Sequence, residues 1–213
     1  MTTVILLMAG LGSRLKASKN KMLVKINDKP LYFYILEKFK RHKCEIILVV
    51  SKNDYDYFNS LNLGYKIVIG GASRQESVLN GLKEVRTDRV LIHDGARILL
   101  SDRIIDECLE NDYDAYFVAT KVINTIRYNK DNDFKTLNRD ELLSVQTPQG
   151  GKTKIFLEAA LQNEARLAEF TDDISMLIDV DINVILGDEK NIKVTTPNDL
   201  SLAKFYLEME GLI

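Results

Sequence analysis

The chain has 213 residues, 46% of them hydrophobic, and its 29 Lys and Arg nearly balance its 31 Asp and Glu. This composition excludes a disordered chain, which is poorer in large apolar residues, and 11 Gly and 3 Pro are too few for a collagen-like one. The net charge of −2 argues against a protein that binds nucleic acid along its surface, so any anion site has to be a local cluster of basic residues.

Strand-like and helix-like segments alternate along the chain. Residues 3–9 form a continuous apolar run that ends at glycine, as expected of a buried strand in a parallel sheet. Further strands are predicted over residues 45–51, 66–69, 89–93, 115–120 and 183–186, and helices over residues 31–41, 54–61, 74–85, 101–111, 153–162 and 196–209. The alternation predicts an α/β fold with a mostly parallel sheet that helices cover on both faces.

Residues 121–143 break this alternation. The stretch is polar, and two β-like pieces, residues 122–128 and 134–137, flank a turn-rich cluster at 129–133. This pattern predicts a β-arm that projects from a single domain spanning residues 1–213.

Cysteine content and apolar run lengths predict a cytoplasmic protein that binds no membrane. Cys44 and Cys108 are too few for a disulfide framework or a zinc site, and we expect buried free thiols. The apolar run at residues 4–9 is too short for a signal peptide, and no later run approaches the roughly 18 apolar residues of a membrane span.

A glycine-containing loop, Ala9-Gly10-Leu11-Gly12-Ser13-Arg14, follows the first predicted strand. Glycines allow a phosphate to approach backbone N–H groups closely. Leu15 stands where the dinucleotide fingerprint requires its third glycine, and Gln146 stands where a P-loop ending at residues 151–153 requires its first. We therefore expect a phosphate site here, but neither a dinucleotide-binding fingerprint nor a P-loop.

Four basic residues come soon after this loop: Arg14, Lys16, Lys19 and Lys21. Because a triphosphate needs fixed cations as well as backbone donors, we interpret Arg14 and Lys21 as functional. Lys16 and Lys19 are interpreted as solvated charges.

Two further motifs follow predicted strands. Residues 70–78, GGASRQESV, are typical both of a nucleotide-binding loop and of an ordinary turn with a helix cap. Residues 93–97, HDGAR, end a strand, where ligands of open α/β sheets lie, so Asp94 is placed to bind a ribose hydroxyl or Mg²⁺. His93 is interpreted as structural. Lys193 alternates with apolar neighbours and is expected to reach into the same cleft.

These motifs follow the order found in the polyol-phosphate cytidylyltransferases, and the chain most closely resembles the 2-C-methyl-D-erythritol 4-phosphate cytidylyltransferase family. The resemblance covers essentially the whole chain and includes residues 147–149 (TPQ), 171–173 (TDD) and 191–195 (NIKVT). It implies a Rossmann-like nucleotidyltransferase fold and transfer of CMP from CTP to the methylerythritol phosphate in non-mevalonate isoprenoid precursor synthesis. Pyrophosphate would be released, with Mg²⁺ as the divalent cation.

The resemblance also implies roles for individual residues. The catalytic cations around the triphosphate would be Arg14, Lys21 and Lys193. The residues that match nucleotide-binding positions are Gly10, Gly12, Gly71, Ala72, Ser77, Asp94 and Gly95, with Asp94 also the metal candidate. The residues that match positions for the polyol phosphate are Arg97, Thr125, Arg139, Thr147 and Thr171. In the family the arm crosses a homodimer interface, so Arg139 would enter the partner's site.

Three residues depart from the family pattern. Asn20 stands where proline usually precedes the catalytic lysine, which leaves Lys19 as an alternative to Lys21. Gly95 and Ile98 stand where alanine and proline are usual. Gly95 is expected to offer its backbone N–H to the ligand, and the loop after it is expected to be looser.

Two other functions stay open. A ribitol-5-phosphate cytidylyltransferase would share the CTP half of the site, but residues 171–175 (TDDIS) favour the methylerythritol enzyme. A non-catalytic nucleotide-binding regulator would not need the cations Arg14, Lys21 and Lys193 together. An NAD-dependent oxidoreductase is excluded by Leu15.

Overall fold

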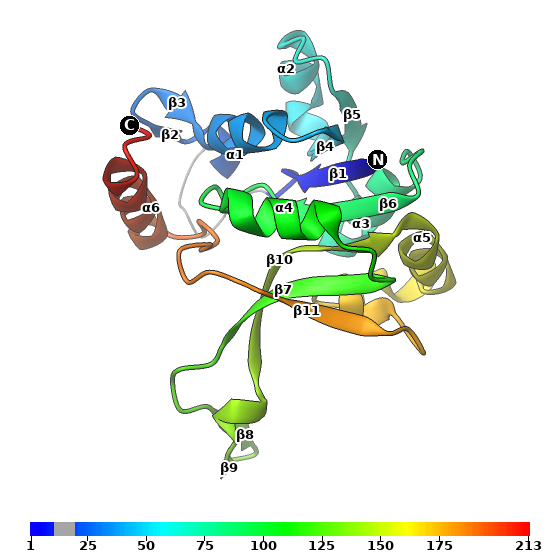
Figure 1. Cartoon of the computed structure of the whole chain (residues 1–213), viewed down its shortest axis with the longest axis vertical. Helices are drawn as coiled ribbons and strands as arrows, with labels where there is room; N and C mark the ends of the chain where they lie inside the picture. Colours follow the sequence, from blue (N-terminus) through cyan, green and yellow to red (C-terminus); the bar gives the residue numbers. More distant parts are fainter. Residues whose placement is uncertain (11–19) are drawn as a thin grey trace.

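A seven-stranded sheet forms the centre of the computed structural model, which describes residues 1–10 and 20–213 (Figure 1). The strand order is β11-β7-β10-β6-β1-β4-β5. The strands are β1 (Thr2–Leu7), β4 (Cys44–Val50), β5 (Lys66–Ile69), β6 (Arg89–Asp94), β7 (Ala115–Lys121), β10 (Leu143–Lys152) and β11 (Ile182–Leu186). Every pair in this order is parallel except the two that β10 makes with β6 and β7. The predicted α/β fold with a mostly parallel sheet is confirmed.

Helices cover both faces of this sheet, as predicted. They are α1 (Leu31–Lys40), α2 (Tyr55–Ser60), α3 (Arg74–Leu82), α4 (Asp102–Glu110), α5 (Thr153–Gln162) and α6 (Pro197–Met209). Successive strand residues point to opposite faces, so Val4 and Leu6 pack in the core of α1, α4 and α6. Ile5 packs on the other face against α3 and α5.

The helix starts follow the capping chemistry of the sequence. The Ser101 hydroxyl accepts a hydrogen bond from the Ile104 N–H at the start of α4. Thr196 and Asp199 form a capping box at the start of α6. Such side chains satisfy N–H groups that have no partner inside the helix.

The predicted arm is a β-hairpin that projects beyond the ends of strands β7 and β10 (Figure 1). It consists of β8 (Arg127–Lys130) and β9 (Asp133–Thr136), which pair antiparallel, while residues 122–126 are not in a strand. A smaller hairpin, β2 (Lys25–Ile26) and β3 (Lys29–Pro30), precedes α1. The central strand β10 and this small hairpin are absent from the sequence prediction.

Both cysteines have free thiols; Cys108 is buried and Cys44 is half-buried. Within residues 1–10 and 20–213, no helix combines the length and the apolar character that crossing a membrane requires.

Candidate functional site

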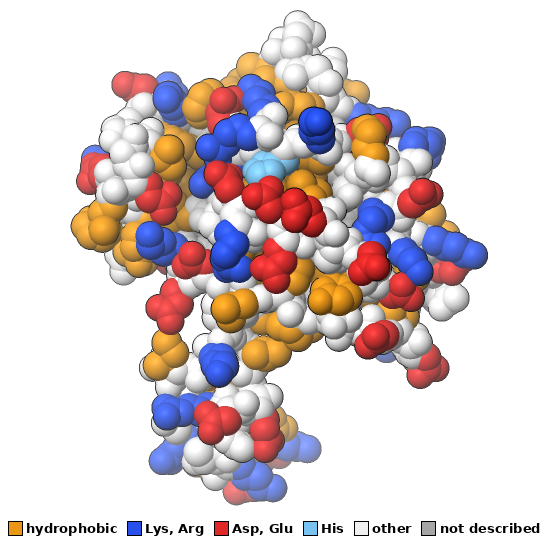
Figure 2. Space-filling view, in the orientation of Figure 1, with side chains coloured by type: hydrophobic (Ala, Val, Ile, Leu, Met, Phe, Trp, Pro, Cys, Tyr) orange, Lys and Arg blue, Asp and Glu red, His pale blue; other side chains and the backbone are white. Residues whose placement is uncertain are grey.

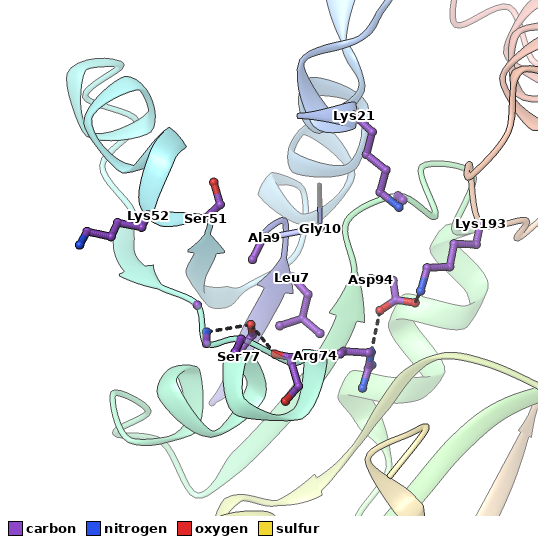
Figure 3. A pocket seen from close by; sticks show the side chains of 15 residues that line it. Leu7, Ala9, Gly10, Lys21, Ser51, Lys52, Arg74, Ser77, Asp94 and Lys193 are labelled. Atoms are coloured by element: carbon purple, nitrogen blue, oxygen red, sulfur yellow. Dashed lines mark hydrogen bonds and ion pairs between the residues drawn. The ribbon is translucent and has the colours of Figure 1, made fainter. Parts of the chain in front are cut away.

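A cavity of about 520 Å³ lies where four parallel strands end (Figure 3). Ala9 and Gly10 follow β1, Ser51 and Lys52 follow β4, residues 70–74 follow β5, and Asp94 is the last residue of β6. The carboxyl edge of such a sheet is where open α/β folds bind their ligands. Seven of the predicted site residues line this cavity: Gly10, Lys21, Gly71, Ala72, Ser77, Asp94 and Lys193. Two others, Gly12 and Arg14, lie outside the described residues, as do Lys16 and Lys19.

Of the basic residues that line this cavity, which also include Lys52 and Arg74, two lysines from distant parts of the chain lie near Asp94. Lys21 begins a short 3-10 helix, η2 (Lys21–Leu23), and its Nζ donates to the Val194 carbonyl oxygen at 3.4 Å. Lys193 places its Nζ 2.8 Å from Oδ2 of Asp94. Both side chains point toward the end of the cavity where Asp94 stands (Figure 3). The cavity therefore presents two ammonium groups near one carboxylate.

Asp94 is a buried carboxylate held between cations. Nε of Arg74 donates to its Oδ1 at 3.1 Å, on the side away from Lys193. Burial alone would raise the pKa of Asp94, but the charges of Arg74 and Lys193 outweigh it and hold that pKa well below its ordinary value. Asp94 is therefore ionised at neutral pH.

Arg74 connects Asp94 to a second buried carboxylate, Asp173. The two terminal nitrogens of Arg74 donate to the two carboxylate oxygens of Asp173 at 2.7 and 2.9 Å. Burial disfavours the charge on Arg74, but Asp173 and Asp94 overcome this and raise its pKa. Such a two-pronged pair fixes orientation as well as charge. Sequence reasoning missed this pair, although Arg74 in the glycine motif and the two aspartates at 172–173 were its signal.

The glycine motif after β5 forms a turn with a helix cap, and this turn also lines the cavity. Ser73 caps α3, and its hydroxyl accepts from the Glu76 N–H. The N–H of Gly71 donates to the Ser77 hydroxyl at 3.0 Å, so the turn is stabilised internally while it also lines the cavity. A Cβ at Gly71 would lie 2.3 Å from Cβ of Glu76, so glycine is required where the turn packs on the helix.

The expectation that Gly95 offers its backbone N–H to a ligand is wrong. That N–H donates to the Leu7 carbonyl oxygen at 2.9 Å, because the pairing of β1 with β6 continues one residue past the end of β6. In the loop after it, Ile98 is fully buried in the core.

Thr147 lies behind Asp94 and is buried. Its hydroxyl accepts from the Asp94 N–H at 3.0 Å and lies 3.1 Å from Nδ1 of His93. Nε2 of His93 faces the Arg97 carbonyl oxygen at 3.1 Å, and because a carbonyl only accepts, Nε2 carries the proton. Thr147 must then donate to Nδ1. Burial lowers the pKa of His93 to about 4, so the ring is neutral and structural, as its sequence position suggested.

The remaining predicted polyol-phosphate residues are spread over the molecule. Arg97 lines a second cavity of about 550 Å³, which Lys193 also lines, between the base of the arm and the first cavity. Thr125 and Arg139 line a cavity of about 420 Å³ within the arm. Thr171 is exposed and lines none of these three cavities. The structure therefore brings Arg97 close to the first cavity, while Thr125 and Arg139 together line the cavity in the arm.

Asp94, the candidate metal ligand, has few other carboxylates near it. In the part of the chain that the structure describes, no three His, Cys, Asp or Glu residues are grouped to hold a metal ion. Asp94 is the one acidic side chain among the described residues of the first cavity.

Comparisons with known proteins agree on one family. Residues 2–209 match the family model described as IspD, 2-C-methyl-D-erythritol 4-phosphate cytidylyltransferase. The chain is 37% identical to the protein of that name from Bacillus cytotoxicus, covering 99% of each chain. It is 35% identical to the one from Bacillus licheniformis, covering 97% of this chain and 96% of the other.

Solved structures give the same result. The crystal structure of 4-diphosphocytidyl-2C-methyl-D-erythritol synthase from Anaerococcus prevotii matches with a TM-score of 0.83 at 29% identity, over 98% of this chain and 96% of the other. The 2-C-methyl-D-erythritol 4-phosphate cytidylyltransferase of Francisella tularensis matches with a TM-score of 0.79 at 28% identity, over 96% and 98%.

Proposed function

The chain belongs to the 2-C-methyl-D-erythritol 4-phosphate cytidylyltransferase family, and we propose from this membership how its cavity performs the reaction. The enzyme transfers CMP from CTP to 2-C-methyl-D-erythritol 4-phosphate in the non-mevalonate route to isoprenoid precursors. One observation carries the assignment of the site: two lysines and one carboxylate converge on a cavity at the ends of four parallel strands. A triphosphate fits this combination of charge and position.

The chemistry is an in-line displacement at phosphorus. An oxygen of the polyol phosphate forms a bond to the α-phosphorus of CTP, the bond from that phosphorus to the bridging oxygen breaks, and pyrophosphate leaves with the electron pair. A phosphate dianion is already a nucleophile, so no side chain has to remove a proton. This agrees with a buried, neutral His93 whose two ring nitrogens are occupied by Thr147 and Arg97.

Catalysis then depends on stabilising charge that develops on the phosphoryl oxygens and on pyrophosphate. Lys21 and Lys193 supply the compensating positive charge from two sides of the cavity. Lys193 is already held in place by Asp94, and Asp94 is held by Arg74. Cations that are positioned before the reaction need no rearrangement while it proceeds, which is the main source of electrostatic catalysis.

We also propose that Asp94 helps to hold Mg²⁺. One carboxylate together with substrate phosphates is a common Mg²⁺ environment, so a single acidic residue in the cavity fits this ion. Both oxygens of Asp94 are engaged by cations, one by Arg74 and one by Lys193, so contact with a metal would replace one of these pairs. A bound Mg²⁺ would neutralise charge on the phosphate oxygens.

The polyol phosphate is assigned to the second cavity, beside Arg97 and next to Lys193. Thr125 and Arg139 line the neighbouring arm cavity and not this one in their own chain, and we propose that a second copy in a homodimer brings them to it. Thr171 is retained as a further candidate for this substrate. The enzyme is proposed to act in the cytoplasm.

Release of pyrophosphate tests the proposed function. Purified protein with CTP and Mg²⁺ should release pyrophosphate when 2-C-methyl-D-erythritol 4-phosphate is added, and not when ribitol 5-phosphate is added. The reverse preference would assign the chain to the ribitol enzymes. CTP binding without turnover on either substrate would favour the non-catalytic regulator.

A variant pair tests the site itself. Lys193→Ala should lower kcat by about 10²- to 10³-fold, the loss typical of removing one transition-state contact. Lys190→Ala is the matched control, because Lys190 lies on the same segment but pairs with Glu210 outside the cavity. Equal activity of the two variants would remove Lys193 from the catalytic site.

A further inference from the structure

Asn20 immediately precedes Lys21 and uses its whole side chain to connect three segments around the cavity. It is only 7% exposed. Nδ2 donates to the Met8 carbonyl oxygen at 3.0 Å and to Oδ2 of Asp54 at 2.7 Å. Oδ1 accepts from the Met22 N–H at 2.9 Å. The two donors and the acceptor of the amide are therefore all used.

The three partners of Asn20 belong to different walls of the first cavity. Met8 lies between β1 and the lining residues Ala9 and Gly10. Asp54 accepts a hydrogen bond from Ser51, which lines the cavity after β4. Met22 is fully buried in the core and belongs to the short helix η2, which starts at Lys21. Lys21 is therefore held between a fixed Asn20 and a fixed Met22.

Few residues other than asparagine fit these contacts. Aspartate would place a second carboxylate against Asp54 and a charged oxygen against the Met8 carbonyl, and it lacks the donors that both require. Alanine would leave the Met22 N–H and the Met8 carbonyl without their partner, and an unpaired buried group is costly. Proline would lose the same contacts, but the backbone of Asn20, with φ −49° and ψ 129°, lies near the angles that a proline ring imposes.

We propose that Asn20 is a positioning residue that sets the place of the Lys21 ammonium in the CTP site. This inference rests on the proposed function only in taking the triphosphate as the ligand of Lys21. Asn20 acts through its three hydrogen bonds. Two of them hold it against the segments after β1 and after β4, and the third holds the Met22 N–H on the other side of Lys21.

A double-mutant cycle on CTP binding tests this role. Asn20→Ala should weaken CTP binding about tenfold in the native background and less than about twofold in the Lys21→Ala background, because the lysine through which it acts is then absent. Effects that multiply in the double variant would overturn the proposal. Asn111→Ala is the matched control, since Asn111 also bonds with both ends of its amide, but at the end of α4. It should lower thermal stability without changing CTP binding.

Asn20→Pro serves if the alanine variant does not fold. It keeps the backbone angle near that observed and removes the side-chain bonds, so CTP affinity should fall between those of the native enzyme and Lys21→Ala. Native affinity would show that the bonds do not position Lys21, and would overturn the proposal. Pyrophosphate release by the native enzyme is measured in parallel. CTP binding without release on either polyol phosphate contradicts the proposed function, while the binding cycle still decides the role of Asn20.

Discussion

Asp94 is positioned through its backbone and through its side chain by different residues. Thr147 accepts its N–H, and Arg74 binds its carboxylate from the side opposite Lys193. Arg74 is in turn fixed by Asp173, whose own N–H donates to Gln149. Asp94, which holds Lys193, is thus itself held by groups from α3, from β10 and from the loop before β11. Substitutions among these supporting residues should therefore alter the position of Asp94 in the cavity.

Thr147 offers the most direct test of this support. Thr147→Val removes the acceptor of the Asp94 N–H and the donor to His93, and two unpaired buried groups should cost about 2–4 kcal/mol of unfolding free energy. Thr147→Ser keeps the hydroxyl and should cost less than about 1 kcal/mol. Urea unfolding gives the stabilities, and kcat and KM are measured alongside. If Thr147→Val instead raises only KM for the polyol phosphate at native stability, Thr147 binds that substrate directly.

His93 predicts a pH dependence of stability. Its pKa in the folded state, about 4, is below the ordinary 6.5, so on acidification the unfolded chain takes up the proton first. The contribution of neutral His93 to the free energy of unfolding is complete above about pH 6.5 and is lost as the pH falls toward 4. Between pH 6.5 and 5 this amounts to about 2 kcal/mol, at about 1.4 kcal/mol per unit. Urea unfolding at several pH values measures it.

His93→Gln should remove this change of the unfolding free energy with pH, which is the slope between pH 6.5 and 5, whatever the variant's stability at pH 7. His42→Gln is the matched control, because it leaves His93 in place and should keep that part. A slope that is unchanged in His93→Gln would show that another group titrates in this window.

Single residues were predictable where their chemistry is explicit in the sequence. Lys21, Asp94 and Lys193 carry charge within recognisable motifs, and they meet in one cavity. The role of the Gly95 N–H was not predictable, because the sequence does not indicate which carbonyl oxygen a backbone N–H will bond to. The pairing of Asp173 is not predictable, because its partner Arg74 is about a hundred residues away and only the fold brings them together.

At the scale of elements, β10 is the main strand that the sequence analysis does not predict. Its ten residues, LSVQTPQGGK, include Pro148 and two glycines, which are typical of loops. Gln146, Thr147 and Gln149 are buried through hydrogen bonds instead of apolar contacts, so no hydrophobic pattern marks the strand. The neighbouring strands β6 and β7 impose the extended form. Elements with an apolar pattern, by contrast, were predicted to within a few residues of their ends.

The glycines of β10 are required by this close packing. Gly151 has φ +149°, and a Cβ there would lie 2.1 Å from the Asp114 carbonyl oxygen. Gly151→Ala should therefore cost more than about 3 kcal/mol of unfolding free energy. Gly64→Ala is the control: its φ of +77° is also unfavourable, but no atom lies within 4 Å of the new Cβ, so about 1 kcal/mol is expected. Urea unfolding compares them, and equal costs would contradict the steric explanation.

At the scale of the whole molecule, the arm is the part least explained by a single chain. It stands away from the body and carries charges of both signs (Figure 2). The side chains of Ile123 and Phe134 are 65% and 58% exposed. A single hairpin with strands of four residues is only marginally stable when nothing packs against it. These features favour an arm that is covered by a second copy, which is also where Thr125 and Arg139 would reach a substrate cavity.

Mixing inactive variants tests whether one site is built from two chains. Lys193→Ala disables the site of its own chain, and Arg139→Ala disables the site of its partner at low polyol phosphate. In a mixed dimer one site contains both defects and the other contains neither. With random exchange half of the dimers are mixed, so about a quarter of the native pyrophosphate release should return.

The matched control mixes Lys193→Ala with Lys21→Ala. Both lysines line the same cavity of one chain, so each site of the mixed dimer keeps one defect and no activity should return. Restoration in both mixtures would mean that the lysines too are shared between chains. Restoration in neither would place Arg139 in the site of its own chain or outside any site, and the arm would then serve association alone.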